Sequence, residues 1–270
     1  LGTNQSIFRV NGTGDTGRPV LWFDISTNTL YLAGSSTYFR ITSQLFRDSS
    51  AWGHLIVAFD TAQSTANDRC KLYWNGTQIT DFSTNNDFSV NTDYGVNQGS
   101  VSWDVGKGYG YLDGYLAEVN FIDGESFFSD TSGTASTTFN INSFGEFGDY
   151  GEWKPKAYTG TYGTNGFYLD FKTGGTGTTG AGKDVSGEGN HWASSGIAST
   201  DQMIDTPTNN FATLNPLDES NSTLSEGNLK TVNGSSYTGA RATMAFPSSS
   251  VGGVTGKWYI EYAEFSTRKS

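Results

Sequence analysis

The amino-acid sequence predicts an all-β protein made of antiparallel strands stacked into sandwiches, and three observations support this prediction. Apolar and polar residues alternate with a period of two in many short segments, as in strands with one buried face. Aromatic residues make up 14% of the chain and there are 35 glycines, which suits short strands joined by tight turns. By the same spacing rule, no amphipathic helical run extends beyond about two turns.

The clearest strand pattern lies in residues 52–80. Apolar side chains alternate along 55–59 and again along 70–74. The second segment ends at Asn75-Gly76, the dipeptide most typical of a tight hairpin, because a type I′ turn needs positive φ at both central positions. We therefore expect an antiparallel unit that continues through 77–80, with one face covered by another sheet.

Further strands are expected at intervals along the chain, with turn residues between them. A spacing of about 8–15 residues is typical of a β-sandwich or a jelly roll. The expected strands cover residues 7–10, 21–25, 30–32, 38–41, 102–105, 115–122 and 167–171.

The chain is expected to have three parts, and the composition changes clearly in the middle one. Residues 1–128 are expected to form the first β-sandwich. Residues 129–200 form a loop-rich connector in which eleven glycines fall between positions 160 and 196. Its embedded aromatic residues favour an ordered segment, because disordered segments are poor in them. Residues 201–270 form the third part, which the second resemblance described below implies to be the start of a truncated β-sandwich. Because the chain ends directly after a strong strand pattern, we expect a piece of a longer or processed polypeptide.

Charge and cysteine content exclude several classes of function. The chain has 27 acidic and 16 basic residues, a net charge of −11, and no basic patch that would indicate nucleic-acid binding. We expect no membrane span either, since no apolar run approaches about 20 residues. Cys70 is the single cysteine, so an internal disulfide is excluded. It alternates with Leu72 and Trp74, which predicts an inert buried thiol.

Several motifs in the first half resemble a laminin-G/concanavalin-like domain. They are Trp52-x-His54-Leu55-Ile56-Val57-Ala58-Phe59-Asp60, Leu72-Tyr73-x-Asn75-Gly76, Asp113-Gly114-Tyr115-Leu116-Ala117-Glu118-Val119 and Asp123-Gly124. The resemblance implies a two-sheet jelly roll whose usual first strand is missing here, so that it lies upstream or comes from another chain. It also implies a calcium ion at the rim of the sandwich. The aspartates near predicted strand ends are Asp60, Asp104, Asp113 and Asp123, although turns alone account for such residues. We assign no metal ligands and expect no other cofactor.

A second set of motifs is similar to large structural proteins of marine bacteriophages. It comprises residues 201–216, 225–230 and 256–262, together with 153–155 and 158–171. In those proteins a laminin-G-like domain is followed by a connector and then by a SPRY-like β-sandwich, whose opening strand would be 256–262. The resemblance implies a virion component of a fibre, a tail or the capsid surface. It further implies other virion proteins as partners, a homo-oligomer with a trimer favoured, and host surface glycans as ligands.

The sequence offers no convincing catalytic residues. Its two histidines, His54 and His191, lie in a strand and in a Gly-Asn-His-Trp turn, where packing or capping explains them. No serine has the Gly-x-Ser-x-Gly frame of a hydrolase. Glycosidases on concanavalin-like sandwiches need two facing carboxylates. Glu261 and Glu264 are three residues apart and therefore on opposite faces of a strand, and Asp123 and Glu125 lie at a turn. We therefore expect a protein that is not an enzyme.

One patch is nominated for glycan binding, which needs exposed aromatic platforms and a few polar groups. It lies in and beside the glycine-rich run 106–111 and comprises Trp103, Asp104, Tyr109, Tyr111 and Asp113. Packing of these aromatic side chains under their own loop remains the alternative. For the whole chain, the alternatives to a virion protein are a secreted carbohydrate-binding or carbohydrate-active protein and a cell-surface adhesin.

Overall fold

The computed structural model confirms the all-β prediction. The structure describes residues 4–11, 19–34, 37–48, 51–96, 101–125, 128, 139–197, 201–203, 206–207, 212–220, 222–225, 228–233 and 239–243. Two short 3-10 turns lie wholly within these residues, η1 (Ala66–Asp68) and η2 (Ile141–Ser143). None of the helical turns in the described part of the chain is long and apolar enough to cross a membrane. The chain divides into two compact units, residues 1–210 and 211–270.

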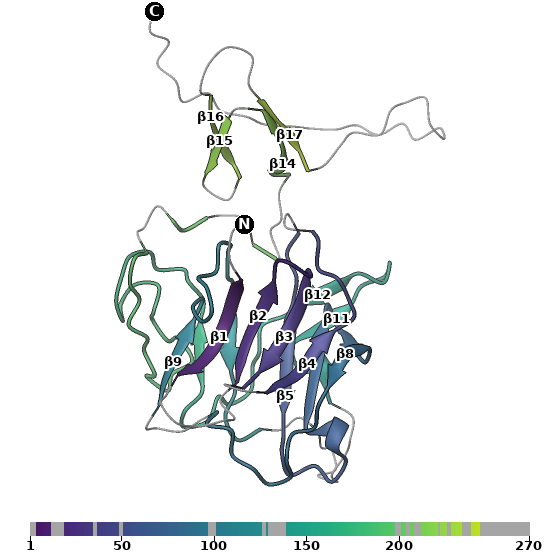
Figure 1. Cartoon of the computed structure of the whole chain (residues 1–270). Helices are drawn as coiled ribbons and strands as arrows, with labels where there is room; N and C mark the ends of the chain where they lie inside the picture. The colour runs from purple at the N-terminus through teal and green to yellow at the C-terminus, as the bar shows by residue number, and fades with distance from the viewer. Residues whose placement is uncertain are drawn as a thin grey trace, which may run out of the picture. The chain divides into compact units, whose positions relative to one another are not determined.

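The larger unit is built on an antiparallel sheet of six strands, here called the first sheet (Figure 1). Its strand order is β8-β4-β3-β2-β1-β9, so neighbouring hairpins form its centre and β9 returns from far along the chain beside β1. The strands are β1 (Gln5–Asn11), β2 (Val20–Asp24), β3 (Thr29–Ala33), β4 (Tyr38–Thr42), β8 (Phe82–Asn85) and β9 (Ser102–Val105).

The second sheet is the predicted antiparallel unit. It contains β5 (Leu55–Phe59), β6 (Cys70–Trp74) and β7 (Thr77–Ile79) in that order. At the turn between β6 and β7, Asn75 has φ 47° and Gly76 has φ 74°. Both values lie in the left-handed region that a type I′ turn requires, so the hairpin predicted from Asn75-Gly76 is confirmed.

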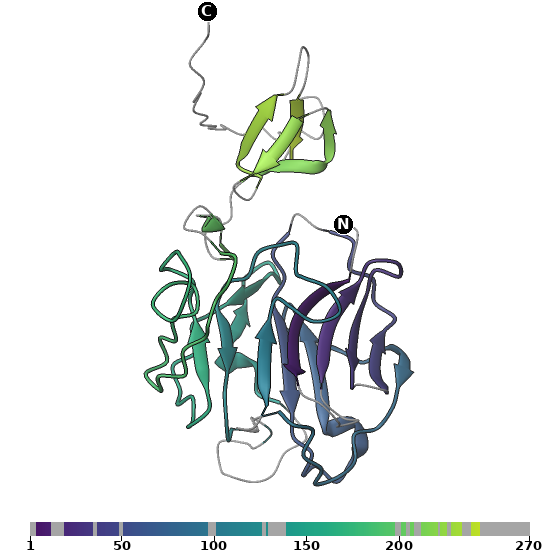
Figure 2. The same cartoon turned by 60° about the vertical axis from the view of Figure 1, so that its left-hand side comes forward.

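The two sheets enclose the main hydrophobic core and lie one behind the other (Figures 1 and 2). The predicted burial of Cys70 is confirmed, since Cys70 and Leu72 of β6 pack in one cluster with Leu21 of β2. The buried members of this cluster are Leu21, Leu30, Leu32, Phe39, Cys70, Leu72, Ile79 and Phe88. Close packing of side chains from both sheets makes the sandwich a rigid support.

The face of the second sheet that points away from the main core is also covered, by residues 128 and 139–144. Ile56, Ala58 and Tyr73 pack against Phe128 and Phe139. The rings of Tyr73 and Phe139 lie 5.3 Å apart. Both faces of β6 are therefore buried, whereas in β5 Ile56 and Ala58 are buried and Val57 remains 38% exposed.

The described part of the glycine-rich segment is ordered and belongs to the larger unit. It contributes β11 (Gly145–Phe147), which pairs with β12 (Trp153–Pro155), and β13 (Phe167–Leu169), which pairs with β10 (Val119–Phe121). Aromatic contacts fix this segment to the sandwich, since Phe167 lies 5.5 Å from Phe121 and 6.4 Å from Trp103.

The structure also differs from the expected strands. It adds β11 and β12, ends β13 at Leu169, and differs at two places in residues 1–128. The strand expected over 115–122 is wrong in its first half, because only 119–121 pairs with a neighbour. Glu118 has φ 54°, which interrupts an extended backbone. Strand β8 was missed because its sequence, Phe-Ser-Thr-Asn, is polar; at the end of the first sheet it buries little.

The described residues of the smaller unit form two antiparallel strand pairs. Strand β14 (Leu214–Ser220) pairs with β17 (Gly239–Ala242), and β15 (Ser222–Ser225) pairs with β16 (Lys230–Asn233). The strand expected over 256–262 lies outside the described residues. The assignment of this unit to a SPRY-like sandwich stays a prediction.

Candidate glycan-binding surface

The first sheet has an outer face, which is the side opposite the core between the sheets. Leu21, Leu30 and Leu32 point into that core, so their neighbours on the same strands point outward. Trp22 of β2 pairs across the sheet with Tyr31 of β3. Both outward positions therefore carry aromatic residues where an ordinary exposed strand would carry polar ones.

Trp22 is the centre of an aromatic cluster on this outer face. Its ring stacks on Tyr31 at 4.9 Å, meets the edge of Tyr109 at 4.9 Å and lies 6.4 Å from Tyr38. Trp22 itself is only 3% exposed, whereas Tyr38 is 54% and Tyr109 is 58% exposed. We call Tyr31, Tyr38 and Tyr109 the tyrosine patch, since they present rings to solvent above a buried tryptophan.

Glycines allow the loop that carries Tyr109 to lie directly on the sheet. Gly106 has φ +74°, and a Cβ atom at Gly108 would lie 2.6 Å from Oγ of Ser6, closer than real atoms approach. The Gly108 N–H donates to the carbonyl of Gly110 at 3.0 Å, which closes the loop tightly. The glycine-rich run is therefore explained by close packing of backbone on sheet.

The structure places the five nominated residues in different surroundings. Tyr109 joins Tyr31 and Tyr38, as described. Trp103 points to the opposite side and packs against Phe8 at 5.7 Å and Phe121 at 4.8 Å, so it belongs to the aromatic packing of the fold.

The other nominated residues lie outside the aromatic cluster. Asp104 accepts from Arg9, with Oδ2 3.1 Å from Nε and 2.5 Å from Nη2. Tyr111 is 72% exposed and makes no ring contact with any described residue. Asp113 is exposed, and its backbone N–H donates to Gln5 Oε1 at 2.5 Å.

Sequence reasoning missed Trp22, Tyr31 and Tyr38. A signal was present, because Trp22 stands between Leu21 and Phe23 in a predicted strand, where alternation predicts an outward, polar residue. An aromatic residue at such a position marks a covered or binding face. What the sequence could not show is that three separate segments bring these rings together.

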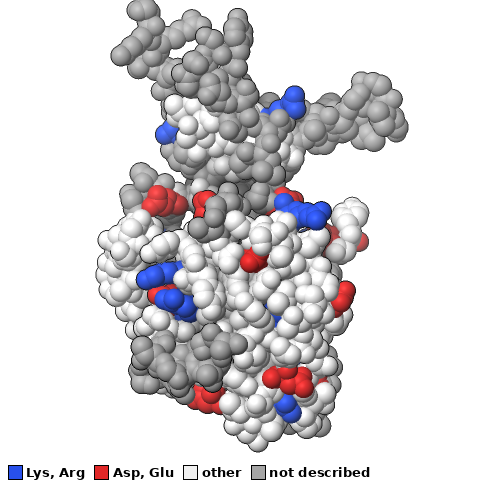
Figure 3. Space-filling view, in the orientation of Figure 1, with Lys and Arg blue, Asp and Glu red and all other residues white. Residues whose placement is uncertain are grey.

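The outer face carries little charge. The surface over β1–β4 is mostly uncharged in Figure 3, and a group of charged side chains lies over β1 and β9, the strands that carry Arg9 and Asp104. These two form an ion pair and so largely neutralise each other. The surface therefore favours ligands that are polar but uncharged.

The two histidines each make a structural hydrogen bond. Trp153 donates from Nε1 to Nδ1 of His54 at 2.8 Å, and the backbone N–H of Asp184 donates to Nδ1 of His191 at 3.0 Å. Burial lowers the pKa of His54, which keeps it neutral and able to accept. Neither contact involves a nucleophile or a second acid.

Among the described residues, Cys70 and Asp123 also lie in structural surroundings. Burial raises the pKa of the Cys70 thiol to about 12, so it is not a thiolate at neutral pH. Asp123 accepts from the backbone and side-chain nitrogens of Asn165, both at 3.1 Å, so it joins the turn after β10 to the turn before β13. The pair Glu261 and Glu264 lies outside the described residues.

The four aspartates considered for calcium do not converge. Asp60 accepts from Ala62 N at 3.0 Å and from Gln63 Nε2 at 2.8 Å, within its own turn. Among the residues that the structure describes, no group of three or more histidine, cysteine, aspartate or glutamate side chains could hold a metal ion.

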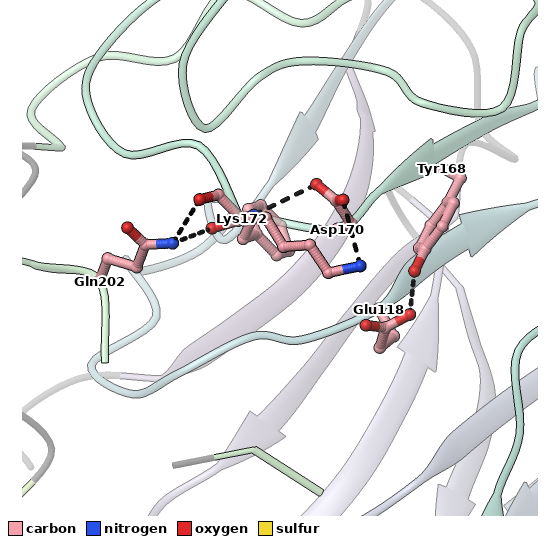
Figure 4. A network of polar contacts seen from close by, with 6 residues as sticks. Glu118, Tyr168, Asp170, Lys172 and Gln202 are labelled. Atoms are coloured by element: carbon pink, nitrogen blue, oxygen red, sulfur yellow. Dashed lines mark hydrogen bonds and ion pairs between the residues drawn. The ribbon is translucent and has the colours of Figure 1, made fainter. Parts of the chain in front are cut away.

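A separate polar network connects β13 to distant residues (Figure 4). The Tyr168 hydroxyl donates to Oε2 of Glu118, and Gln202 Nε2 donates to the carbonyls of Phe171 and Lys172 at 2.9 and 2.7 Å. Burial, followed by the bond to Glu118, raises the pKa of Tyr168. These groups satisfy one another, so the network ties the chain together and offers no free site.

Asp184 organises the glycine-rich loop that follows β13. Its Oδ1 accepts from the backbone nitrogens of Tyr168 and Ser186, both at 2.9 Å. Its Oδ2 accepts from Ser186 Oγ at 2.9 Å and from Asn190 N at 2.8 Å. Burial acts to raise the pKa of Asp184, but these hydrogen bonds together outweigh it and the pKa is lowered. This carboxylate is a structural anchor.

Comparison with known proteins gave no relative. A scan against protein-family models, a search of curated proteins and a search of solved structures each found no match.

Proposed function

We propose that this chain is a non-enzymatic structural component of a virion, from a fibre, a tail or the capsid surface, and that it binds host surface glycans through the tyrosine patch. The patch on the outer face of the first sheet is the observation that carries the binding proposal. The virion assignment depends on the motif resemblance in residues 153–171, 201–216, 225–230 and 256–262.

The tyrosine patch has the chemistry that a sugar requires. An aromatic ring packs against the apolar C–H face of a sugar, while a phenol hydroxyl exchanges hydrogen bonds with sugar hydroxyls. The hydroxyls of Tyr31, Tyr38 and Tyr109 have no hydrogen-bond partner among the described residues. Tyrosine also loses little conformational freedom on binding, because it has only two side-chain torsions.

The sandwich supplies rigidity for this surface. Trp22 and Tyr31 are held by β2 and β3, which lie inside the first sheet and pair on both sides. Side chains on strands are held in position more precisely than side chains on loops. In this proposal the sandwich displays the patch, and assembly involves other virion proteins and a homo-oligomer, with a trimer favoured. Strands β8 and β9 at the ends of the first sheet are suitable edges for pairing.

Glycan-array binding of the purified chain tests the binding proposal. We expect Tyr38→Ala and Tyr109→Ala each to weaken binding about tenfold, which corresponds to ~1.4 kcal/mol. Tyr150→Ala is the matched control, since Tyr150 is 96% exposed and lies outside the patch, between β11 and β12. Absence of any glycan binding by the wild-type chain would overturn the proposal. Binding by Tyr38→Ala and Tyr109→Ala that is as tight as binding by the Tyr150→Ala control would also overturn it.

Electron microscopy of the source particles tests the virion assignment. Gold-labelled antibodies raised against the purified chain should decorate a fibre, a tail or the capsid surface. Purified particles that lack the chain, by labelling and by mass spectrometry, would refute this part. Glycan binding would then indicate a secreted or cell-surface protein.

A further inference from the structure

The indole N–H of Trp22 is a buried donor in the middle of the tyrosine patch. Its Nε1 atom has no hydrogen-bond partner among the described residues, and it is shielded from solvent. Buried donors in folded proteins almost always have an acceptor, because leaving one unpaired destabilises the fold. An unpaired donor therefore calls for an explanation, and one explanation is a ligand that supplies the acceptor.

Two of the rings around Trp22 differ in how firmly they are held. Tyr31 stacks on Trp22 from the neighbouring strand, with 23° between the ring planes. Tyr109 meets Trp22 edge-on at 74° from the loop 106–111, and it is 58% exposed with an unpaired hydroxyl. Exposed side chains change rotamer rapidly, whereas packed strand residues do not. Tyr109 is therefore the ring that can turn aside without disturbing the sheet.

We infer that Trp22 is a specificity-determining residue of the glycan site: Tyr109 turns aside, and a hydroxyl of the bound sugar accepts a hydrogen bond from Trp22 Nε1. This inference rests on the proposed glycan binding and assigns a role to a residue beneath the visible patch. The sugar ring then packs against Tyr38 and the displaced Tyr109. Binding supplies the acceptor that the free protein lacks.

The same surroundings select the class of glycan. The outer face is mostly uncharged in Figure 3, and its Arg9–Asp104 ion pair is already formed. The chain as a whole has a net charge of −11, which repels polyanions. We therefore assign the site to neutral oligosaccharides. A site built to hydrogen-bond a ligand hydroxyl discriminates strongly against an analogue without it.

Replacing the N–H of Trp22 by sulfur, as β-(3-benzothienyl)alanine introduced at position 22, tests the inference. This residue keeps the fused-ring shape and removes only the donor. We expect its affinity for neutral hexasaccharides (maltohexaose, cellohexaose and laminarihexaose as probes) to fall about tenfold, while its melting temperature stays equal or rises. Trp22→Phe, a variant available by ordinary mutagenesis, should show the same loss of affinity.

The outcomes separate this inference from the proposed function. Unchanged affinity in the benzothienyl variant, together with weaker binding by Tyr38→Ala, would overturn the role of Trp22 and leave glycan binding standing. Failure of the wild-type chain to bind any probe would overturn both. Tighter binding of a hyaluronan hexasaccharide than of the neutral probes would overturn the assigned ligand class.

Discussion

Replacing Asp184 by asparagine should destabilise the larger unit more than any other single-atom change in the glycine-rich segment. The buried carboxylate accepts four hydrogen bonds, two on each oxygen, at 2.8–2.9 Å. Asparagine keeps one acceptor oxygen, but its NH2 group replaces the other oxygen and faces two hydrogen-bond donors. The Ser186 hydroxyl can rotate to accept, but one backbone N–H then has no acceptor. With hydrogen bonds to charged groups contributing ~1.5–3 kcal/mol each, we expect a loss of about 2–4 kcal/mol.

Urea unfolding followed by tryptophan fluorescence measures this loss, with limited proteolysis to detect opening of the loop alone. Asp170→Asn is the matched control, because Asp170 accepts from Lys172 N at 3.2 Å and pairs with its exposed ammonium at 3.5 Å. We expect the control to change stability by less than about 1 kcal/mol. A loss at Asp184 no larger than the control's, without easier proteolysis, would refute the role of the carboxylate as an anchor.

The lowered pKa of Asp184 gives an independent check by pH. Its contribution to stability is complete above the ordinary carboxyl pKa of 3.8 and is lost as the pH falls towards the lowered value. The wild-type chain should therefore lose more stability than the Asp184→Asn variant below about pH 4. Parallel stability curves for the two proteins over this range would contradict the hydrogen-bonded carboxylate.

Three other predictions follow from single contacts. Burial lowers the pKa of His54, so its contribution to stability should be complete above pH 6.5. This contribution should decline as the pH falls, because a proton on Nδ1 blocks the hydrogen bond from Trp153. Thermal melts between pH 7 and 5 should show this dependence in the wild-type chain and not in a His54→Gln variant. Gly76→Ala should cost roughly 1–3 kcal/mol in urea unfolding, because φ is +74° and the new Cβ would lie 2.1 Å from the Trp153 ring; an unchanged midpoint would contradict the packing. Cys70 has a pKa of about 12 and is buried, so a thiol reagent at pH 8 should label it only in denaturant; rapid labelling of the native chain would show that the thiol is accessible.

Much of the fold could be predicted because a strand with one buried face shows a period-two pattern in its own sequence. The alternation in 55–59 and 70–74 and the Asn75-Gly76 turn depend on backbone geometry within a few residues, and the structure agrees with each. The failures occur where local pattern and tertiary pairing disagree. Residues 115–118 alternate but have no partner strand, and residues 82–85 are polar but lie beside β4.

The sequence by itself determined the all-β class, the hairpin, the buried cysteine and the presence of aromatic residues in a glycine-rich loop. Only the tertiary structure decided which of those aromatic residues gather. Tyr109 and Tyr38 each contact Trp22 on one side of the first sheet, while Trp103, six residues before Tyr109, turns to the other side. The physical reason is that alternation fixes a side chain's face relative to its own strand. Which face remains outside depends on how distant strands pair and on what packs against them, and no short stretch of sequence contains that information.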